Sequence, residues 1–162
     1  MVLPRLIIFD LDFTLWDCGG TWCDCLTPPF TLRRNRVFDR GSRHIRLYDE
    51  VLLILDRCDA HGVPVALASR TEQPRWAREL IDLLGVSGRF ARAEIYPSSK
   101  VKHFSALRLA SGIDFADMLF FDDETRNIQE VGNLGVTSIL VEDGITRQIF
   151  EDSLRRHAAR IQ

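Results

Sequence analysis

The sequence places polar and charged side chains after each of four apolar stretches. These positions are Asp10 and Asp12, Ser69 and Arg70, Lys100, and Asp122 and Asp123. If the apolar stretches form strands of an open parallel sheet, the residues that follow them meet at the carboxyl edge, where such sheets bind their ligands. The sequence therefore predicts one pocket that gathers acidic groups, a lysine, an arginine and a serine.

Asp10 and Asp12 form the most informative pair in this set. They are two residues apart, a spacing that directs both side chains to the same side of an extended backbone. Two carboxylates so close repel each other unless a cation or a shared proton relieves the repulsion, and oxygen-rich sites favour Mg²⁺. Asp122 and Asp123 add further oxygen ligands. Either pair alone is typical of a helix cap or a solvated surface, whereas both pairs together favour a magnesium site.

Strand-like and helix-like segments alternate along the chain and must hold these residues in place. Short apolar runs predict strands at residues 6–9, 63–68, 93–96, 118–121 and 137–141. Apolar residues at helical spacing predict helices at residues 49–61, 71–84, 100–110, 125–134 and 145–161. This order predicts an α/β fold with a doubly wound parallel sheet and helices on both faces.

Helical spacing also assigns an inward face to each predicted helix. Val51, Leu52, Leu55 and Cys58 are expected to face the sheet from the first helix. Val101, Phe104 and Leu107 are expected to do so from the third helix.

Residues 17–46 interrupt the alternation of strands and helices. The segment lacks helical spacing but contains Gly19-Gly20, Pro28-Pro29 and scattered positive charge. Structureless loops of this length are uncommon unless they are functional, so we predict a short β-hairpin flap inserted over the strand ends. The segment is too short for a separate cap domain, so residues 1–162 are expected to form a single domain. We expect packing within the flap, with the mouth of the site as the alternative, for the aromatic residues Trp16, Trp22 and Phe30.

Composition and charge exclude several classes of protein. The chain has 162 residues, 46% of them hydrophobic, and its 21 Lys and Arg against 23 Asp and Glu give a net charge of −2. No positive excess exists to neutralise a phosphate backbone, so nucleic acid is not an expected partner. No apolar run approaches the roughly 20 residues of a membrane span, and the N-terminus lacks the pattern of a secretory signal. We therefore expect a cytoplasmic protein, with nuclear residence left open. As a separate expectation, the protein is a monomer.

The motif around Asp10 resembles the signature of a known group of phosphotransferases. The stretch from Asp10 to Thr14 is similar to the Asp-x-Asp-x-Thr pattern of the haloacid dehalogenase (HAD) superfamily, and Ser69, Lys100 and Asp122-Asp123 follow in the order of its other motifs. Residues from about 6 to 143 also resemble the eukaryotic magnesium-dependent phosphatases of that superfamily. The resemblance implies a capless, HAD-like Rossmannoid fold. It also implies phosphotyrosine or sugar-phosphate substrates, including fructosamine phosphates.

The resemblance assigns roles to the acidic residues. Asp10 is expected to be the nucleophile that forms an aspartyl-phosphate, and Asp12 the general acid and base. Mg²⁺ is expected to bind Asp10, the backbone carbonyl of Asp12 and Asp123, and to neutralise phosphoryl charge that would otherwise repel the nucleophile. Asp122 is expected just outside the metal ligands, where it orients water or Lys100, although it could exchange roles with Asp123.

Four other residues are expected in the pocket. Ser69 can donate its hydroxyl to a phosphate oxygen and Lys100 can supply a compact positive charge; the alternatives are a helix cap and a solvated lysine. Lys102 is the rival candidate, but the turn before Lys100 places Lys100 at the start of the helix. The guanidinium group of Arg70 suits a second anionic or planar part of the substrate, with a surface salt bridge as the alternative. Asn127 is expected to hydrogen-bond nearby, with a helix-surface position as the alternative.

The cysteines of the flap admit a separate interpretation. Cys18, Cys23 and Cys25 with His44 suggest a zinc site, but structural zinc sites usually present two closely spaced pairs, and no second pair follows. We therefore interpret the cysteines as reduced thiols that serve packing or are incidental.

Two functions of different classes fit these residues. The first is a magnesium-dependent phosphatase that hydrolyses phosphate monoesters of small molecules or phosphoproteins, with protein tyrosine phosphatase activity included. The second is a receiver-like module that binds metal and a phosphoryl group without hydrolysis. Asp12 separates the two, because only hydrolysis needs a general acid and base to release the phosphate.

Overall fold

The computed structural model describes all 162 residues, and its centre is a parallel sheet of five strands. From edge to edge the strands are β7 (Arg92–Ile95), β6 (Val65–Ser69), β1 (Leu6–Phe9), β8 (Met118–Asp122) and β9 (Thr137–Leu140). All neighbouring strands of this sheet run parallel. The predicted doubly wound α/β fold is therefore confirmed, and each predicted strand overlaps an observed one.

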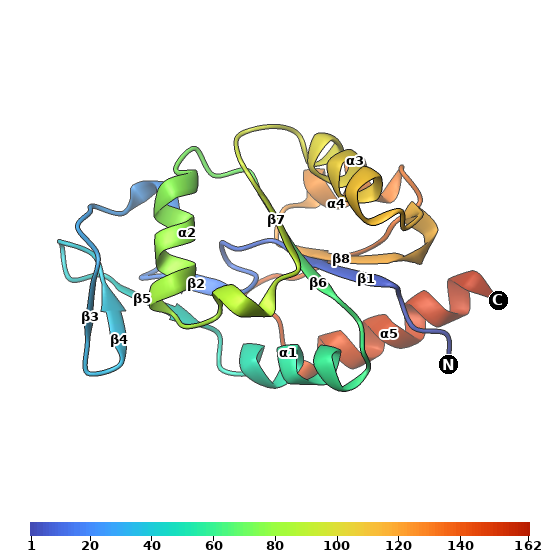
Figure 1. Cartoon of the computed structure of the whole chain (residues 1–162), viewed down its shortest axis with the longest axis horizontal. Coiled ribbons are helices and arrows are strands. Elements are labelled where there is room, and N and C mark those ends of the chain that lie inside the picture. Colours follow the sequence, from blue (N-terminus) through green and yellow to red (C-terminus); the bar gives the residue numbers. More distant parts are fainter.

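Five helices cover the two faces of the sheet. The larger core cluster receives side chains from α1 (Val51–Ala60), α2 (Pro74–Leu83) and α5 (Arg147–Ile161). The smaller cluster receives them from α3 (Lys100–Ser111) and α4 (Thr125–Gly132). Figure 1 shows α3 and α4 on one side of the sheet and α1 and α5 on the other. None of these helices combines the length and the apolar character that crossing a bilayer requires.

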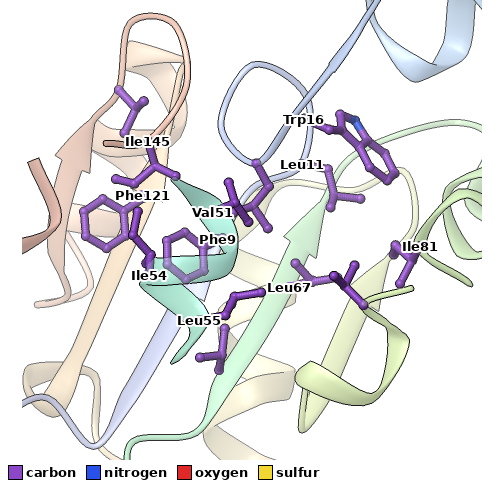
Figure 2. Close-up of a cluster of buried hydrophobic side chains, with 14 of the residues drawn as sticks. Phe9, Leu11, Trp16, Val51, Ile54, Leu55, Leu67, Ile81, Phe121 and Ile145 are labelled. Carbon is purple, nitrogen blue, oxygen red and sulfur yellow. The ribbon is translucent and has the colours of Figure 1, made fainter. Parts of the chain in front are cut away.

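Strand β1 is buried on both faces, which explains its uninterrupted apolar sequence. Successive side chains of a strand point to opposite faces, so Phe9 packs into the larger cluster whereas Ile8 packs into the smaller one. Phe9 stacks on Phe121 of β8, with the ring centroids 5.2 Å apart. In Figure 2 these two rings lie beside Ile54 of α1, so the core joins the centre of the sheet to the helix that precedes β6.

The strand order creates a topological switch point beside β1. The chain proceeds outward from β1 through β6 to β7, and α3 then carries it back to β8 on the other side of β1. Doubly wound sheets bind ligands outside the carboxyl ends of the strands at such a point. The polar residues that follow β1, β6 and β8 therefore leave the sheet where a binding site is expected.

The segment predicted as a flap forms a second, antiparallel sheet. Its strand order is β2 (Trp16–Cys18), β5 (His44–Leu47), β4 (Arg36–Phe38) and β3 (Thr31–Arg33). The predicted hairpin is present in β3 and β4, and the other two strands extend it to a four-stranded sheet. A short 3₁₀ helix, η1 (Cys23–Cys25), lies between β2 and β3 in the chain.

The inward faces of two helices differ from the prediction. Leu52 is 50% exposed and Val101 is 36% exposed, so the inward positions predicted for them are wrong. In α3 the buried face begins at Lys100 and continues through Phe104 and Leu107. Lys100 occupies a position that an apolar residue would normally take, because its ammonium group is paired with two carboxylates.

The loop between β1 and β2 is fixed by backbone contacts from a distant part of the chain. The amide of Gly144 donates a hydrogen bond to the carbonyl of Phe13 at 2.8 Å. The amide of Ile145 donates a hydrogen bond to the carbonyl of Thr14 at 2.9 Å. Gly144 has a φ of +85°, and a β-carbon at this position would overlap the ring of Tyr48. Glycine is therefore required at position 144 both for its backbone conformation and for its close approach to the ring.

Gly144→Ala is expected to destabilise the protein more than Gly62→Ala does. Gly62 also has a positive φ, +66°, but a β-carbon there would meet nothing within 4 Å. Gly62→Ala should therefore lower the free energy of unfolding by about 1 kcal/mol through backbone strain alone. Gly144→Ala should lower it by about 1 to 3 kcal/mol more through crowding. Urea unfolding curves measure both losses, and equal losses would contradict the close approach to Tyr48.

Candidate active site

A pocket of about 440 Å³ opens at the carboxyl ends of the central strands. Its lining is charged and polar apart from two hydrophobic residues, Trp22 and Cys25. The lining includes seven residues that were predicted from the sequence, namely Asp10, Asp12, Ser69, Arg70, Lys100, Asp123 and Asn127. Asp122 is fully buried behind them and contacts Lys100. Folding thus gathers all of the selected residues at one place.

The ammonium group of Lys100 lies between two carboxylates at the base of the pocket. Its Nζ is 3.1 Å from Oδ1 of Asp10 and 3.1 Å from Oδ2 of Asp122, and it also donates to the carbonyl oxygen of Ala68. One side chain of α3 therefore joins β6, β8 and the residue that follows β1. Lys102 is exposed, and its Nζ lies 5.8 Å from the ring centroid of Tyr96 rather than in the pocket.

This pairing keeps Lys100 charged inside the protein. Burial by itself would lower the pKa of the lysine, but the carboxylates of Asp10 and Asp122 outweigh burial and raise the pKa above its usual value. Only 1% of the side chain is exposed. Because removal of one member of a buried ion pair typically costs about 3 to 5 kcal/mol, the three side chains depend on one another.

Asp122 directs its oxygens at protein donors. Its Oδ1 accepts a hydrogen bond from the amide of Glu124 at 2.8 Å, and its Oδ2 accepts one from Nδ2 of Asn127 at 3.1 Å. The Oδ1 of Asn127 in turn accepts a hydrogen bond from Arg70 at 3.1 Å. A chain of polar contacts thus runs from the buried end of β8 to the guanidinium group of Arg70 in the pocket wall.

Three carboxylates at this edge of the sheet lie close enough to share one cation. Oxygen atoms of Asp10, Asp122 and Asp123 all lie within 4.8 Å of one another. Burial raises the pKa of Asp10 well above its usual value, and the neighbouring Asp122 adds to this effect. Burial likewise raises the pKa of Asp123 to about 6. A divalent cation would offset this mutual repulsion, and carboxylate oxygens are the ligands that Mg²⁺ prefers.

The side chain of Asp12 lies outside this acidic cluster and is held by the flap. Its Oδ1 accepts hydrogen bonds from Nε1 of Trp16 at 2.8 Å and from the amide of Cys23 at 2.9 Å, with Sγ of Cys18 at 3.7 Å. Burial raises the pKa of Asp12, and the bonds from Trp16 and Cys23 offset part of this rise. Asp12 therefore has a fixed orientation and a raised pKa, which are properties of a general acid.

Ser69 ends β6 with its side chain in the pocket lining. Its Oγ accepts a hydrogen bond from the amide of Thr71 at 3.3 Å. Because a hydroxyl group has one hydrogen and two lone pairs, this contact leaves the hydrogen of Ser69 free to donate to an anion in the pocket.

A contact that was not predicted from the sequence joins the flap to the loop after β6. Asp24 of η1 accepts hydrogen bonds from the hydroxyl of Thr71 and, at 3.2 Å, from the amide of Glu72. We name this pair of hydrogen bonds the Asp24 clasp. Asp24 and Thr71 are 47 residues apart in the chain, so no local pattern could have related them.

The flap also places an aromatic residue at the mouth of the pocket. Trp22 is 52% exposed, so the prediction that it packs within the flap is wrong and the alternative position at the mouth is correct. Its ring meets that of Phe13 edge to face, with the centroids 5.6 Å apart. Trp16 and Phe30 are buried, as predicted.

Comparison with known proteins relates this chain to a family. A family model described as acid phosphatase matches residues 2–160. The chain belongs to the acid phosphatase family. This phosphatase is 43% identical over 158 residues to magnesium-dependent phosphatase 1 of Homo sapiens, and the match covers 96% of the chain and 88% of the human protein. It is 36% identical over 147 residues to a HAD-like hydrolase superfamily protein of Schizosaccharomyces pombe, and this match covers 83% of each.

Solved structures share the fold of the phosphatase at low sequence identity. A HAD-superfamily hydrolase from Ehrlichia chaffeensis is 15% identical and covers 100% of both chains, with a TM-score of 0.69. A predicted phosphatase from Clostridium acetobutylicum is 14% identical and covers 98% of this chain and 99% of its own, with a TM-score of 0.68. These structures confirm the predicted HAD-like fold. The relative from Schizosaccharomyces pombe, at 36% identity, confirms the resemblance to the HAD superfamily that the sequence predicted.

Asp24→Ala is expected to lower the kcat of the phosphatase at least tenfold, a rise in the barrier of about 1.4 kcal/mol, with little change in KM. Loss of the clasp frees η1, and with it the amide of Cys23 that orients Asp12. Asp24→Asn should retain most of the activity, because its amide oxygen can still accept the hydroxyl hydrogen of Thr71. Steady-state kinetics with p-nitrophenyl phosphate measure these effects.

Asp17→Ala is the matched control for the clasp. Asp17 is another flap aspartate, but its partners, the amide of Gly20 at 2.7 Å and Arg46 at 3.9 Å, lie within the flap itself. This variant should keep the kcat of the unmodified protein. Equal losses of kcat in the Asp17 and Asp24 variants would contradict a specific effect of the clasp.

Proposed function

We propose that this phosphatase hydrolyses phosphate monoesters with the help of Mg²⁺, through an aspartyl-phosphate on Asp10. The observation that carries the proposal is the position of Asp10 in the pocket, beside both the ammonium group of Lys100 and the carboxylate of Asp123. A carboxylate can attack phosphorus only where positive charge offsets the negative charge of the phosphoryl group. The name of the human relative, which specifies magnesium, supports the choice of metal.

The metal ligands in this proposal come from the loop after β1 and from the end of β8. Asp10 and Asp123 hold Mg²⁺ through their side chains, together with the backbone carbonyl of Asp12. When bound, the cation neutralises negative charge on the phosphoryl group and on these carboxylates. Asp122 keeps its oxygens on protein donors, Lys100 among them, so it positions the lysine from outside the ligand set.

Asp10 and Asp12 divide the proposed reaction between them. An oxygen of Asp10 bonds to phosphorus as the bond to the ester oxygen breaks, and Asp12 gives its proton to that leaving oxygen. Asp12 then takes a proton from water as the water attacks the aspartyl-phosphate, which releases inorganic phosphate and restores Asp10. Ser69 donates a hydrogen bond to a phosphate oxygen. Lys100 acts as a nearby positive charge, because its three N–H groups already have acceptors.

The surroundings of Asp12 support hydrolysis over the receiver-like alternative. A module that only holds a phosphoryl group has no need of a positioned general acid. In this site three donors of the flap orient the Asp12 carboxyl, and burial raises its pKa. These features suit a group that must be protonated in one step and ionised in the next.

The lining of the pocket supports two classes of substrate. Its many polar and charged side chains suit a sugar phosphate, a fructosamine phosphate included, whose hydroxyl groups need hydrogen-bond partners. The exposed ring of Trp22 suits the aromatic group of a phosphotyrosyl side chain, because aromatic rings prefer edge-to-face or offset contacts with one another. Both classes therefore belong to the proposal, phosphotyrosyl proteins among them.

Asp10→Asn is expected to lower kcat at least about a thousandfold, because an amide cannot act as the nucleophile. Removal of metal with a chelator should stop turnover by the unmodified enzyme, and added Mg²⁺ should restore it. Release of inorganic phosphate measures both effects, and mass spectrometry of acid-quenched enzyme should find the phosphoryl group on Asp10. Asp114→Asn is the matched control, since Asp114 is a surface aspartate paired with Arg108 at 2.9 Å, and it should retain full activity.

Three results would contradict this mechanism. They are turnover by Asp10→Asn at the rate of the unmodified enzyme, a covalent adduct on another residue, and activity that is indifferent to metal. Asp12→Ala tests the division of roles, because it should retain a phosphorylated Asp10 that hydrolyses slowly. Unchanged dephosphorylation by this variant would remove the general acid and base from the mechanism.

Trp22→Ala is expected to lower kcat/KM for a phosphotyrosyl peptide about tenfold through loss of an aromatic contact of roughly 1 to 1.5 kcal/mol. The same variant should leave kcat/KM for a sugar phosphate nearly unchanged. A panel of phosphotyrosyl peptides, phosphoseryl peptides and sugar phosphates, each assayed with and without Mg²⁺, measures the difference. Equal losses for all substrates would show that Trp22 supports the flap rather than an aromatic substrate.

A further inference from the structure

The flap sheet carries a concentration of positive charge that the proposed reaction does not use. Residues 31–46 contain six arginines and a single acidic residue, Asp39, which gives a net charge of +5. Since the whole chain has a net charge of −2, its other residues together carry −7. In Figure 1, β3 and β4 of this segment lie at the end of the molecule opposite the two termini. We name residues 31–46 the arginine ribbon.

Most arginines of the ribbon have no acidic partner. All six are exposed, and only Arg46 forms ion pairs, at 3.9 Å with Asp17 and at 3.7 Å with Asp49. Asp39 is buried and its carboxylate accepts hydrogen bonds from two backbone amides rather than from a guanidinium group. The arginines that remain free to bind an external anion are Arg33, Arg34, Arg36, Arg40 and Arg43.

The backbone that carries these arginines is well defined before any partner binds. β3 and β4 pair from Thr31 with Phe38 to Arg33 with Arg36. The two residues of the turn, Arg34 and Asn35, both have a positive φ, as a tight two-residue hairpin turn requires. A preformed hairpin loses less conformational entropy on binding than a flexible loop does.

We propose that the arginine ribbon is a docking site for an acidic segment of another polypeptide. Guanidinium groups bind carboxylates and phosphates through pairs of parallel hydrogen bonds, so a hairpin that carries several of them fits a run of Asp, Glu or phosphorylated side chains. Complementary charge of this kind also increases the rate at which two proteins meet. Binding at the ribbon does not depend on the reaction proposed for the pocket.

Backbone geometry favours a polypeptide as the occupant. β3 is the edge strand of its sheet. Because a two-residue turn joins Arg33 to Arg36, these two form a hydrogen-bonded pair, and the next pair, Leu32 with Val37, is of the non-hydrogen-bonded type. In an antiparallel ladder the amide and carbonyl groups of such a residue point away from the partner strand. They are therefore available to an extended chain that lies along the edge, with its acidic side chains near the arginines.

Two other features disfavour a nucleic acid. Phe38 carries the only phenyl ring of the ribbon, and this ring already contacts His44 at 5.3 Å and Arg33 at 4.8 Å, which leaves less of it to stack on a base. The negative charge on the rest of the molecule would repel a long polyanion. A short acidic segment confined to the ribbon escapes most of this repulsion, because salt screens charges beyond about 8 to 10 Å.

The ribbon belongs to the same flap as η1, whose residues Cys25 and Asp24 line the pocket. An acidic partner bound to the ribbon is thereby held on the flap that forms one wall of the pocket. If that partner also carries a phosphate ester, docking raises its effective concentration at the pocket, a consequence that rests on the proposed function.

Fluorescence anisotropy with labelled probes tests the docking site on the full chain. The main probe is a peptide of the same length as the ribbon in which Glu alternates with Ser, and the comparison probes are its Lys counterpart and a single-stranded RNA of equal length. We expect the Glu peptide to bind, the Lys peptide not to bind, and high salt to weaken binding of the Glu peptide at least about tenfold.

Matched charge reversals locate the binding surface. The double variant Arg34→Glu/Arg36→Glu should weaken binding of the Glu peptide at least tenfold. The control Arg147→Glu/Arg156→Glu makes the same change in net charge at exposed positions of α5 and should leave binding unchanged. Both double variants should hydrolyse p-nitrophenyl phosphate at the rate of the unmodified protein, so a failure of docking is distinguishable from a failure of the proposed reaction.

Three results would overturn the docking site. The first is no binding of the Glu peptide. The arginines would then serve only to prevent edge strand β3 from pairing with other chains. The second is an equal loss of binding in both double variants, which would place the interaction elsewhere. The third is tighter binding of the RNA than of the peptide, which would assign the ribbon to nucleic acid.

Discussion

The buried ammonium group of Lys100 is the interaction on which the rest of the site depends. The lysine comes from α3, yet its three acceptors belong to Asp10, Ala68 and Asp122 on or beside three neighbouring strands. A charged side chain is stable at 1% exposure because these acceptors surround it. The lysine in turn holds together two carboxylates whose repulsion would otherwise destabilise the switch point of the sheet.

The two aspartates of the first motif differ because their surroundings differ. Asp10 shares the edge of the sheet with Lys100, whereas the Asp12 side chain is oriented by Trp16 and the amide of Cys23 in the flap. The pKa of a carboxyl group follows from its burial, neighbouring charges and hydrogen bonds, so two aspartates in one loop can serve as nucleophile and as general acid. The flap therefore contributes to the proposed site directly, because it orients the general acid.

The flap is firmly attached to the body of the molecule, although the two differ in charge. Val37 and Ile45 of the flap belong to the same buried cluster as Phe9 and Phe121 of the central sheet. The Asp24 clasp adds polar contacts to this packing. A continuous core lets the flap keep a fixed position while its outer surface carries an excess of arginine over an acidic body.

The sequence by itself determined the order of strands and helices and half of the residues that line the pocket. Strand β1 and the aspartates after it could be predicted from neighbouring positions in the chain. An uninterrupted apolar run indicates a strand buried on both faces, and polar residues follow it directly. The exposure of Leu52 and Val101 could not, because helical spacing does not say which of several partly apolar faces meets the sheet. Tertiary structure alone decided the Asp24 clasp and the four-stranded flap, since both depend on contacts between segments far apart in the chain.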